Sequence, residues 1–135
     1  MGKIDDIKKL AGRVVSEREI FNTEYKKLLE TTISPALCDI ADGFFRDRNK
    51  YVTPHVSGHT KTQISFTHVD KLDVNLAYTF AGDFGACRVL FLAGTSILSR
   101  HALAELATKE NVKALVLNEL EREIKAMVPE ESGHA

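Results

Sequence analysis

Apolar residues in the first quarter of the chain recur at helical spacing. Between residues 4 and 30 they return every three or four positions among charged side chains, at Ile7, Leu10, Val14, Phe21, Tyr25 and Leu28. This pattern predicts one or two amphipathic helices. Ser34 then stands as an N-cap residue beside Pro35 at a first helical position, which predicts a further short helix ending near Gly43 or Asn49.

From Tyr51 onward the pattern changes to that of extended structure leading to Gly58. Residues 61–67 alternate apolar and polar side chains, as a half-buried strand does. Residues 70–81 are open to two interpretations, because they alternate like a strand while Asp73 can also cap a helix. Periodicity favours the strand.

The next segments combine a long apolar run with a polar turn. Residues 87–93 are apolar apart from Arg88 and predict a strand buried on both faces. After Gly94, either Thr95 or Ser96 can cap a helix. We expect that helix to reach about residue 109.

Residues 112–117 are also open to two interpretations. They can begin a helix that runs to Met127, or form a short buried strand before a helix at Glu119. As a strand they would complete a right-handed strand, helix, strand unit with residues 87–93. Open parallel sheets bind ligands at the carboxyl ends of their strands, and a helix start offers free amides to an anion. The candidate ligand-binding residues there are Gly94, Thr95 and Ser96.

Composition is that of one ordinary globular domain. The chain has 135 residues, of which 44% are hydrophobic and 27% charged, and its formal net charge is −1. A chain of this size needs neither disulfides nor a structural metal to fold, and its near-neutral charge gives no general electrostatic reason to bind nucleic acid. We expect a single domain over residues 1–128 with an N-terminal helical extension over residues 1–31, and a flexible tail over residues 129–135.

Nothing in the chain predicts export or membrane insertion. The opening residues lack the apolar core of a signal peptide, and no run of about 18 apolar residues is present. Cys38 and Cys87 lie far apart without a partner motif, so reduced thiols are expected. The sequence therefore favours a cytoplasmic protein with no membrane span.

Seven short segments, in one order over about 100 residues, resemble a known family. They are Ser34 to Ile40 (S-P-A-L-C-D-I), Gly58 with Gln63-Ile64, Asp73 to Tyr78, Gly85 with Arg88-Val89-Leu90 and Gly94, Ala104 to Ala107, Val112 to Leu117, and Arg122 to Met127. In this order the chain resembles the RraA-like proteins. That family includes the regulators of ribonuclease E and the 4-hydroxy-4-methyl-2-oxoglutarate aldolases.

The resemblance implies a fold and a site. It implies an α/β chain in which N-terminal helices precede a small mixed sheet with a parallel strand, helix, strand unit, as in part of a swivelling β/β/α domain. Residues 73–81 would then be a short helix and residues 112–117 the second parallel strand. Arg122 would hold the carboxylate of a small 2-oxo acid, and Glu123 would bind Mg²⁺ or Mn²⁺, which polarises the keto oxygen. Glu105 would join the ligand-binding residues.

Two departures from the family bear on function. Asn118-Glu119 replaces the family's Asp-Gly, and the family continues with further strands where this chain ends soon after Met127. The resemblance therefore favours a shortened relative that acts as a non-catalytic binding, assembly or regulatory module. The alternative is a divalent-metal-dependent 2-oxo-acid lyase of the aldolase or oxaloacetate decarboxylase type that uses the Arg122-Glu123 pair.

Other residues that carry chemistry have plain structural interpretations. Arg122 and Glu123 stand among further charges, as on a solvated helix face. Four side chains are favoured as scattered structural groups over a metal site, namely His55, His59, His68 and Asp70. Asp39 and Asp42 share a helix face and are expected to point to water. No serine or cysteine nucleophile with a base stands out.

The amphipathic N-terminal segment predicts self-association. Between Ile4 and Leu29 it carries more apolar residues than one face of a small domain can cover. A homo-oligomer would bury the remainder, and the resemblance points the same way because RraA-like proteins are commonly trimeric. Another protein is the alternative partner.

Overall fold

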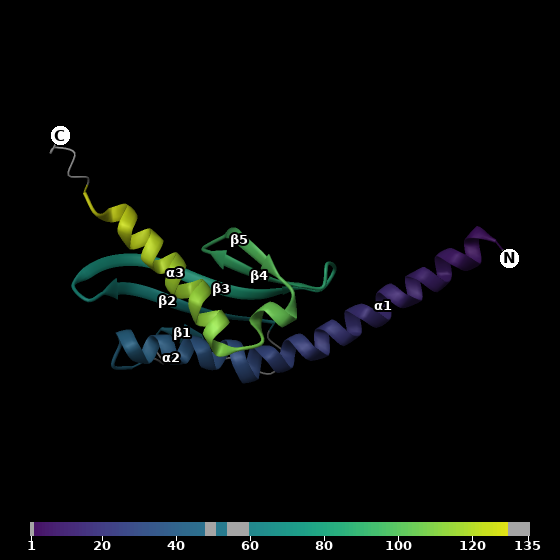
Figure 1. Cartoon of the computed structure of the whole chain (residues 1–135), viewed down its shortest axis with the longest axis horizontal. Coiled ribbons are helices and arrows are strands. Elements are labelled where there is room, and N and C mark those ends of the chain that lie inside the picture. Colours follow the sequence, from purple (N-terminus) through teal and green to yellow (C-terminus); the bar gives the residue numbers. More distant parts are fainter. Residues whose placement is uncertain (1, 48–50, 54–59, 130–135) are drawn as a thin grey trace.

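The computed structural model describes residues 2–47, 51–53 and 60–129 of a mixed α/β chain. Its helices are α1 (Lys3–Leu28), α2 (Ser34–Phe44) and α3 (Lys109–Met127), with a π-helical segment η1 (Leu29–Ile33) and a 3-10 turn η3 (Leu103–Leu106). Its strands are β1 (Val52–Thr53), β2 (Lys61–Val69), β3 (Leu72–Asp83), β4 (Arg88–Ala93) and β5 (Ser96–His101). The expectation of N-terminal helices followed by a small sheet is confirmed (Figure 1).

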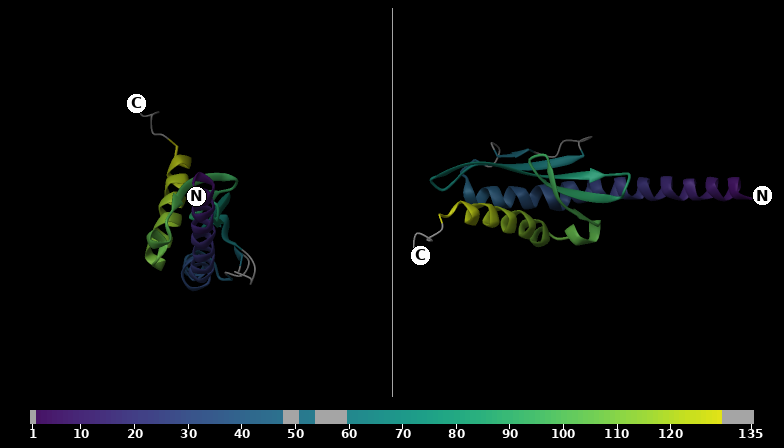
Figure 2. Two further views of the ribbon diagram at one scale, coloured as in Figure 1. Left: turned by 90° about the vertical axis from the view of Figure 1, so that its right-hand side faces the viewer. Right: turned by 90° about the horizontal axis from the view of Figure 1, so that it is seen from above.

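The sheet is an antiparallel meander with its helices on one face. The strand order is β1-β2-β3-β4-β5, and each strand pairs with its neighbour in sequence. Alternate side chains of β2, β3 and β4 are buried against the helices, namely Ile64, Phe66, Tyr78, Phe80, Val89 and Phe91. Seen from above, α1, α2 and α3 all lie on the same side of the sheet (Figure 2). The molecule therefore has two layers and one core between them.

Two strands follow the sequence pattern closely. The alternation over residues 61–67 lies within β2, and β3 confirms the strand that periodicity favoured for residues 70–81. The short helix that the family resemblance implied over residues 73–81 is therefore wrong. The alternation of side chains along β3 places both Tyr78 and Phe80 in the core. A helix over the same residues would point these two side chains in different directions.

The predicted strand over residues 87–93 is confirmed as β4, but its burial on both faces is wrong. Only Val89 and Phe91 are buried, whereas Leu90 and Leu92 are partly exposed on the face that carries no helix. Helices cover both faces of a parallel sheet, but they cover one face of this antiparallel meander.

The helix expected to start at Thr95 or Ser96 is also wrong. Gly94 takes φ +60°, a conformation that suits the first central residue of a two-residue hairpin turn. Gly94 and Thr95 thus reverse the chain between Ala93 and Ser96, which pair with each other, and residues 96–101 return as strand β5.

Residues 112–117 belong to helix α3, so the parallel strand, helix, strand unit is absent. The Thr108 Oγ1 accepts a hydrogen bond from the Asn111 N–H at 3.2 Å and caps the helix. Val112, Val116 and Leu120, spaced by four, are buried against the core. The interpretation as a helix running to Met127 is confirmed, and the swivelling β/β/α arrangement is not.

The first two helices are joined without a break. Ser34 does not cap α2 as predicted, because it is itself helical and its N–H donates to the Leu29 carbonyl across the π-helical turn. The buried residues Phe21, Tyr25, Leu29, Ile33 and Leu37 recur every four positions. In a regular helix that spacing drifts by about 40° per step, and the wider π turn brings the later residues back to the core.

The point where α1 leaves the body is an aromatic cluster. Phe21 and Tyr25 stack with ring centroids 5.7 Å apart, and Phe84 meets both rings edge-on. The Tyr25 hydroxyl donates to the Thr60 carbonyl at 2.5 Å. Gly82 on β3 lies under this ring, where an added Cβ would meet the Tyr25 Cε2 at 2.8 Å. Close approach of α1 to the sheet therefore requires a glycine here.

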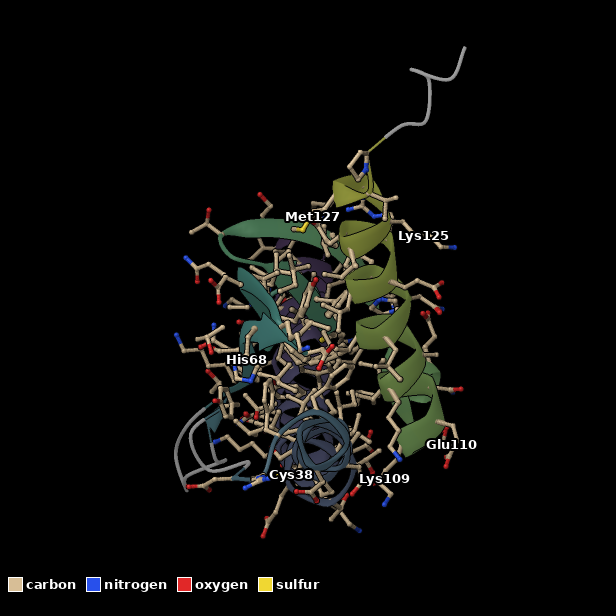
Figure 3. The ribbon with its side chains drawn as sticks, turned by 90° about the vertical axis from the view of Figure 1, so that its left-hand side faces the viewer. Cys38, His68, Lys109, Glu110, Lys125 and Met127 are labelled. Carbon is tan, nitrogen blue, oxygen red and sulfur yellow. The ribbon has the colours of Figure 1, made fainter. Side chains whose placement is uncertain are left out.

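Helices α2 and α3 are held together by charge as well as by apolar contacts. The Asp39 carboxylate lies 3.0 Å from the ammonium groups of both Lys109 and Lys113. Figure 3 shows Lys109 at the start of α3 reaching toward α2, whereas Glu110 beside it points away. The expectation that Asp39 simply faces water is wrong, because the aspartate bridges two helices that are distant in sequence.

Some predicted features lie outside the described residues. These are Asn49, His55, Val56, Gly58, His59 and residues 130–135 of the expected tail. Cys38 and Cys87 are not joined in a disulfide, and each is partly buried.

We expect Gly82→Ala to lower the free energy of unfolding by about 1–3 kcal/mol, because the new methyl group must displace the Tyr25 ring. Urea denaturation followed by circular dichroism measures the change. Gly85→Ala is the matched control, since an added Cβ there meets only Asp83 Oδ1 at 3.6 Å. Equal stability of the two variants would contradict the close approach.

Asp39→Asn should destabilise the protein slightly, and only where the carboxylate is charged. Hydrogen bonds from Lys109 and then Lys113 hold the pKa of Asp39 below its usual value. A lowered native pKa stabilises the fold above the unfolded-state pKa, and this contribution disappears as the pH falls through the native pKa. We expect Asp39→Asn to lower the free energy of unfolding by less than about 1 kcal/mol at pH 7. Near pH 2 the substitution should have no effect on the free energy of unfolding. Asp73→Asn, at an exposed position of β3, controls for removal of one charge.

Candidate functional site

The structure separates most of the predicted site residues. Gly94 and Thr95 form the β4–β5 turn and Ser96 begins β5, whereas Arg122 and Glu123 lie on α3. Gly94 and Glu123 nevertheless line one cavity of about 350 Å³, together with Tyr78. Two of the expected residues thus share a cavity, although no parallel sheet edge brings them there.

The helix start that was expected to offer an anion site at residues 94–96 is absent, because these residues form a turn and the beginning of β5. The Gly94 N–H donates to the Ala77 carbonyl at 3.0 Å within the sheet, and Ser96 pairs with Ala93. Backbone groups used in strand pairing are not free to hold a ligand. The helix start on which the prediction of Gly94, Thr95 and Ser96 relied is therefore wrong, and ligand binding by these residues stays a prediction.

Arg122 lies on an exposed face of α3 and is occupied by its own helix. Its guanidinium binds both oxygens of Glu119, and its Nη2 lies 3.0 Å from the Glu123 carboxylate. Hydrogen bonds from Arg122 lower the pKa of Glu119. With 62% of its side chain exposed, Arg122 fits the interpretation as a solvated helix face.

Metal binding through Glu123 finds no support in the part of the chain described here. Within residues 2–47, 51–53 and 60–129, no three His, Cys, Asp or Glu side chains are arranged to hold a metal ion. The carboxylate of Glu123 is instead paired with Arg122. The 2-oxo-acid lyase activity stays a prediction without a metal-binding group to carry it.

The hydroxyl of Tyr78 is the most unusual group beside these charges. It is fully buried and has no hydrogen-bond partner among the described residues. Burial, and then the charges of Glu123 and Glu119, raise the pKa of Tyr78 to about 12. The phenol is therefore a neutral donor at physiological pH.

A hydrogen-bonded network of Ser99, His101 and Glu105, which the sequence pattern did not predict, lies at the end of β5. The Ser99 Oγ lies 2.6 Å from His101 Nε2, and His101 Nδ1 lies 2.9 Å from Glu105 Oε2. Ser99 and His101 are alternate residues on one face of β5, and η3 brings Glu105 to the imidazole. The signal available in the sequence was the spacing: Ser99 and His101 are two residues apart, and Glu105 follows four residues later. This spacing is informative only once residues 96–101 are known to form a strand.

In this network Ser99, His101 and Glu105 stand in the order of a nucleophile, a base and a carboxylate. A carboxylate on Nδ1 holds the proton there, so that Nε2 can accept a proton from the serine hydroxyl. Acyl transfer also needs an oxyanion hole and a substrate cleft, which these three residues do not supply. Glu105 also accepts the Ala102 N–H at 3.3 Å, so the network fastens the end of β5 to η3.

Of the three histidines that the sequence favoured as structural, His68 lies within the described residues. The His68 ring packs edge-on against Phe45 and Tyr51, with centroids 5.1 and 5.9 Å away. His68 and Asp70 line a cavity with these aromatic rings. Arg46 and Asp47 also line this cavity, whereas the ring contacts of His68 itself are aromatic, as expected of a packed histidine.

Several large apolar side chains near the start of α1 are exposed and form one surface. Its exposed side chains, with their exposed fractions, are Ile4 (71%), Ile7 (56%), Leu10 (56%), Val14 (43%) and Val15 (54%). They lie on the same helix face as Phe21 and Tyr25, because α1 continues straight past the sheet (Figure 1). We call these five residues the projecting stripe.

Comparisons with protein-family models, with characterised proteins and with solved structures found no match to this chain. The helices within the described residues include none with the length and apolar character to cross a membrane. The geometry above is therefore the basis for a proposal about function.

The Glu105 carboxylate should select the imidazole tautomer of His101. We expect nitrogen NMR of the wild-type protein above pH 8 to show a proton on Nδ1, because Glu105 accepts it. In Glu105→Ala the Nε2–H form should gain population. Arg122→Ala is the control for the loss of a surface charge. An Nε2–H imidazole in the wild type would contradict the assigned network.

Proposed function

We propose that this protein is a binding and assembly module without a catalytic role, and that residues 3–17 of α1 are its docking element. The observation that carries the proposal is the projecting stripe. It extends the helix face that packs on the sheet, yet it lies beyond the sheet and is exposed along its whole length. Such a surface is typical of a segment that binds another polypeptide.

The apolar surface is large enough to matter for association. Full burial of an aliphatic side chain contributes about 1.5–3 kcal/mol, and the five residues of the projecting stripe are 43–71% exposed, so covering them completely offers roughly 4–8 kcal/mol. Association costs about 4–15 kcal/mol of lost freedom. The stripe therefore supplies a substantial share of the free energy that a specific complex needs.

The projecting helix also gains stability by docking. Without tertiary contacts, helices of about 12–15 residues are marginal in water. Gly12, where an added Cβ would meet no other part of the protein within 4 Å, weakens this helix by about 1 kcal/mol relative to alanine. A partner that covers the stripe would hold residues 3–17 in the helical state.

The proposal does not depend on the family resemblance, whose helix over residues 73–81 and second parallel strand are absent from the fold. It rests on the exposed stripe and on its continuity with the anchored part of α1. A cytoplasmic location, which the sequence favours, belongs to the same proposal.

A photo-crosslinking amino acid at position 10 should form one discrete adduct in cells that make the protein naturally. Leu10 belongs to the stripe, whereas Ser16 is exposed on the opposite side of the same helix and is the matched control position. Denaturing electrophoresis and mass spectrometry give the yield and the mass of the adduct. Equal yields from positions 10 and 16 would contradict a docking function for the stripe.

A further inference from the structure

We propose that the cavity between the end of α2 and the β2–β3 turn binds a small quaternary ammonium compound of the choline type. Aromatic rings form the walls of this cavity, and carboxylates stand at its rim. The cavity lies at the opposite end of the molecule from the projecting stripe (Figure 1), so this ligand site is independent of the proposed docking function. It adds a binding activity that the proposed function does not include.

The cavity lies where three parts of the chain meet, and it has a volume of about 420 Å³. Residues 44–47 come from the end of α2, Tyr51 directly precedes β1, and His68 and Asp70 come from the end of β2 and the turn after it. Figure 3 looks onto this end of the molecule and labels His68 on β2. A cavity of this size suits a small organic ligand, since ligand pockets commonly start at about 300 Å³.

The aromatic walls of the cavity form a corner. The rings of Phe45 and Tyr51 stack with their centroids 3.7 Å apart and their planes at 13°. The His68 ring stands nearly perpendicular to both, at 80° to Phe45 and 84° to Tyr51. Phe44, which is 39% exposed, lines the cavity beside them. Ring planes at a right angle enclose a ligand from two sides.

Aromatic walls favour an organic cation over a neutral ligand. The face of an aromatic ring is negative and attracts a positive group within about 6 Å of the ring centroid. A quaternary ammonium group carries no N–H, so its methyl groups can contact the rings without leaving a hydrogen-bond donor unpaired. A primary ammonium group would lose hydrogen bonds to water that the aromatic walls cannot replace. The walls therefore suit a quaternary ammonium group best.

The charges at the rim favour a cation as well. Asp47 and Asp70 are exposed carboxylates, and Arg46 is an exposed cation. One positive and two negative charges leave the lining with a formal charge of −1 when His68 is neutral. No three His, Cys, Asp or Glu side chains within residues 2–47, 51–53 and 60–129 are arranged to hold a metal ion. An organic cation therefore fits this cavity better than a metal ion does.

The backbone at Asp70 allows its charge to be removed without rebuilding the turn. Asp70 has a φ of +52°, in the left-handed region. Aspartate and asparagine occupy this region more readily than other residues with a side chain. Asp70→Asn therefore removes the carboxylate charge and keeps a residue that tolerates the same backbone conformation.

Titration of the full chain with choline, followed by NMR of the aromatic side chains, tests the site. We expect saturable shifts for the rings of Phe45, Tyr51 and His68. The comparison ligand is 3,3-dimethylbutan-1-ol, a neutral compound of the same shape in which carbon replaces the quaternary nitrogen. Choline should bind about tenfold more tightly, because the neutral compound lacks the attraction to ring faces and carboxylates. Equal affinities of the two compounds, or no saturable shifts, would overturn the proposal.

Two variants assign the binding to this cavity. Asp70→Asn should weaken choline binding about threefold and leave the binding of 3,3-dimethylbutan-1-ol unchanged, since only a charge is removed. Tyr51→Leu should weaken choline binding at least about threefold because it removes a ring. Glu110→Gln, at an exposed position of α3 outside the cavity lining, is the control and should bind choline as the wild type does. Circular dichroism and the unfolding midpoint verify that each variant is folded. Wild-type affinity in both Asp70→Asn and Tyr51→Leu would overturn the assignment of the cavity.

The negative rim also selects among quaternary ammonium compounds. Phosphocholine adds a phosphate to the same trimethylammonium group, and the carboxylates of Asp47 and Asp70 would repel it. Choline should therefore bind more tightly than phosphocholine, and the difference should shrink at high salt. Tighter binding of phosphocholine would overturn the proposal of a free cationic ligand and favour a lipid headgroup. None of these outcomes affects the crosslink from position 10, which tests the projecting stripe separately.

Discussion

The contact between Tyr25 on α1 and Gly82 on β3 constrains much of this structure. The helix approaches the sheet so closely that a glycine is required under the tyrosine ring, and Phe21 and Phe84 close around it. The buried hydroxyl is paired with the Thr60 carbonyl just before β2, so one side chain connects the helix to two parts of the sheet. This contact fixes the direction in which α1 leaves the body.

Because α1 is anchored there by its second half, its first half has no sheet beneath it. The same periodic face therefore has two environments, a core after Arg18 and solvent before it. Apolar burial stabilises only the anchored half in the single chain. An exposed continuation of a core-forming face is the physical basis for proposing an assembly module.

The order of short sequence segments that resembles the RraA-like family accompanies a different arrangement of strands and helices in this structure. Apolar runs such as residues 112–117 fit a buried strand and a buried helix equally well when read alone. In the structure Val112 and Val116 share one helix face, and β4 pairs with β5 through a short turn at Gly94. A parallel unit needs its crossover helix between the strands, and the chain at residues 96–101 is used for pairing instead.

The sequence by itself determined the elements whose periodicity is long and unambiguous. The three-and-four spacing over residues 4–30 is sufficient for α1, and the alternation over residues 61–67 is sufficient for β2, since each pattern fits one regular structure. Over residues 70–81 the alternation favoured the strand that β3 forms, although a helix was also open there. The exposed charges of Arg122 and Glu123 were likewise readable as a helix surface. Only the tertiary structure decided residues 94–117, where the turn at Gly94 and the burial of Val112 come from contacts with distant residues. It also decided the Ser99, His101 and Glu105 network, because strand register and the position of η3, rather than local propensity, bring those side chains together.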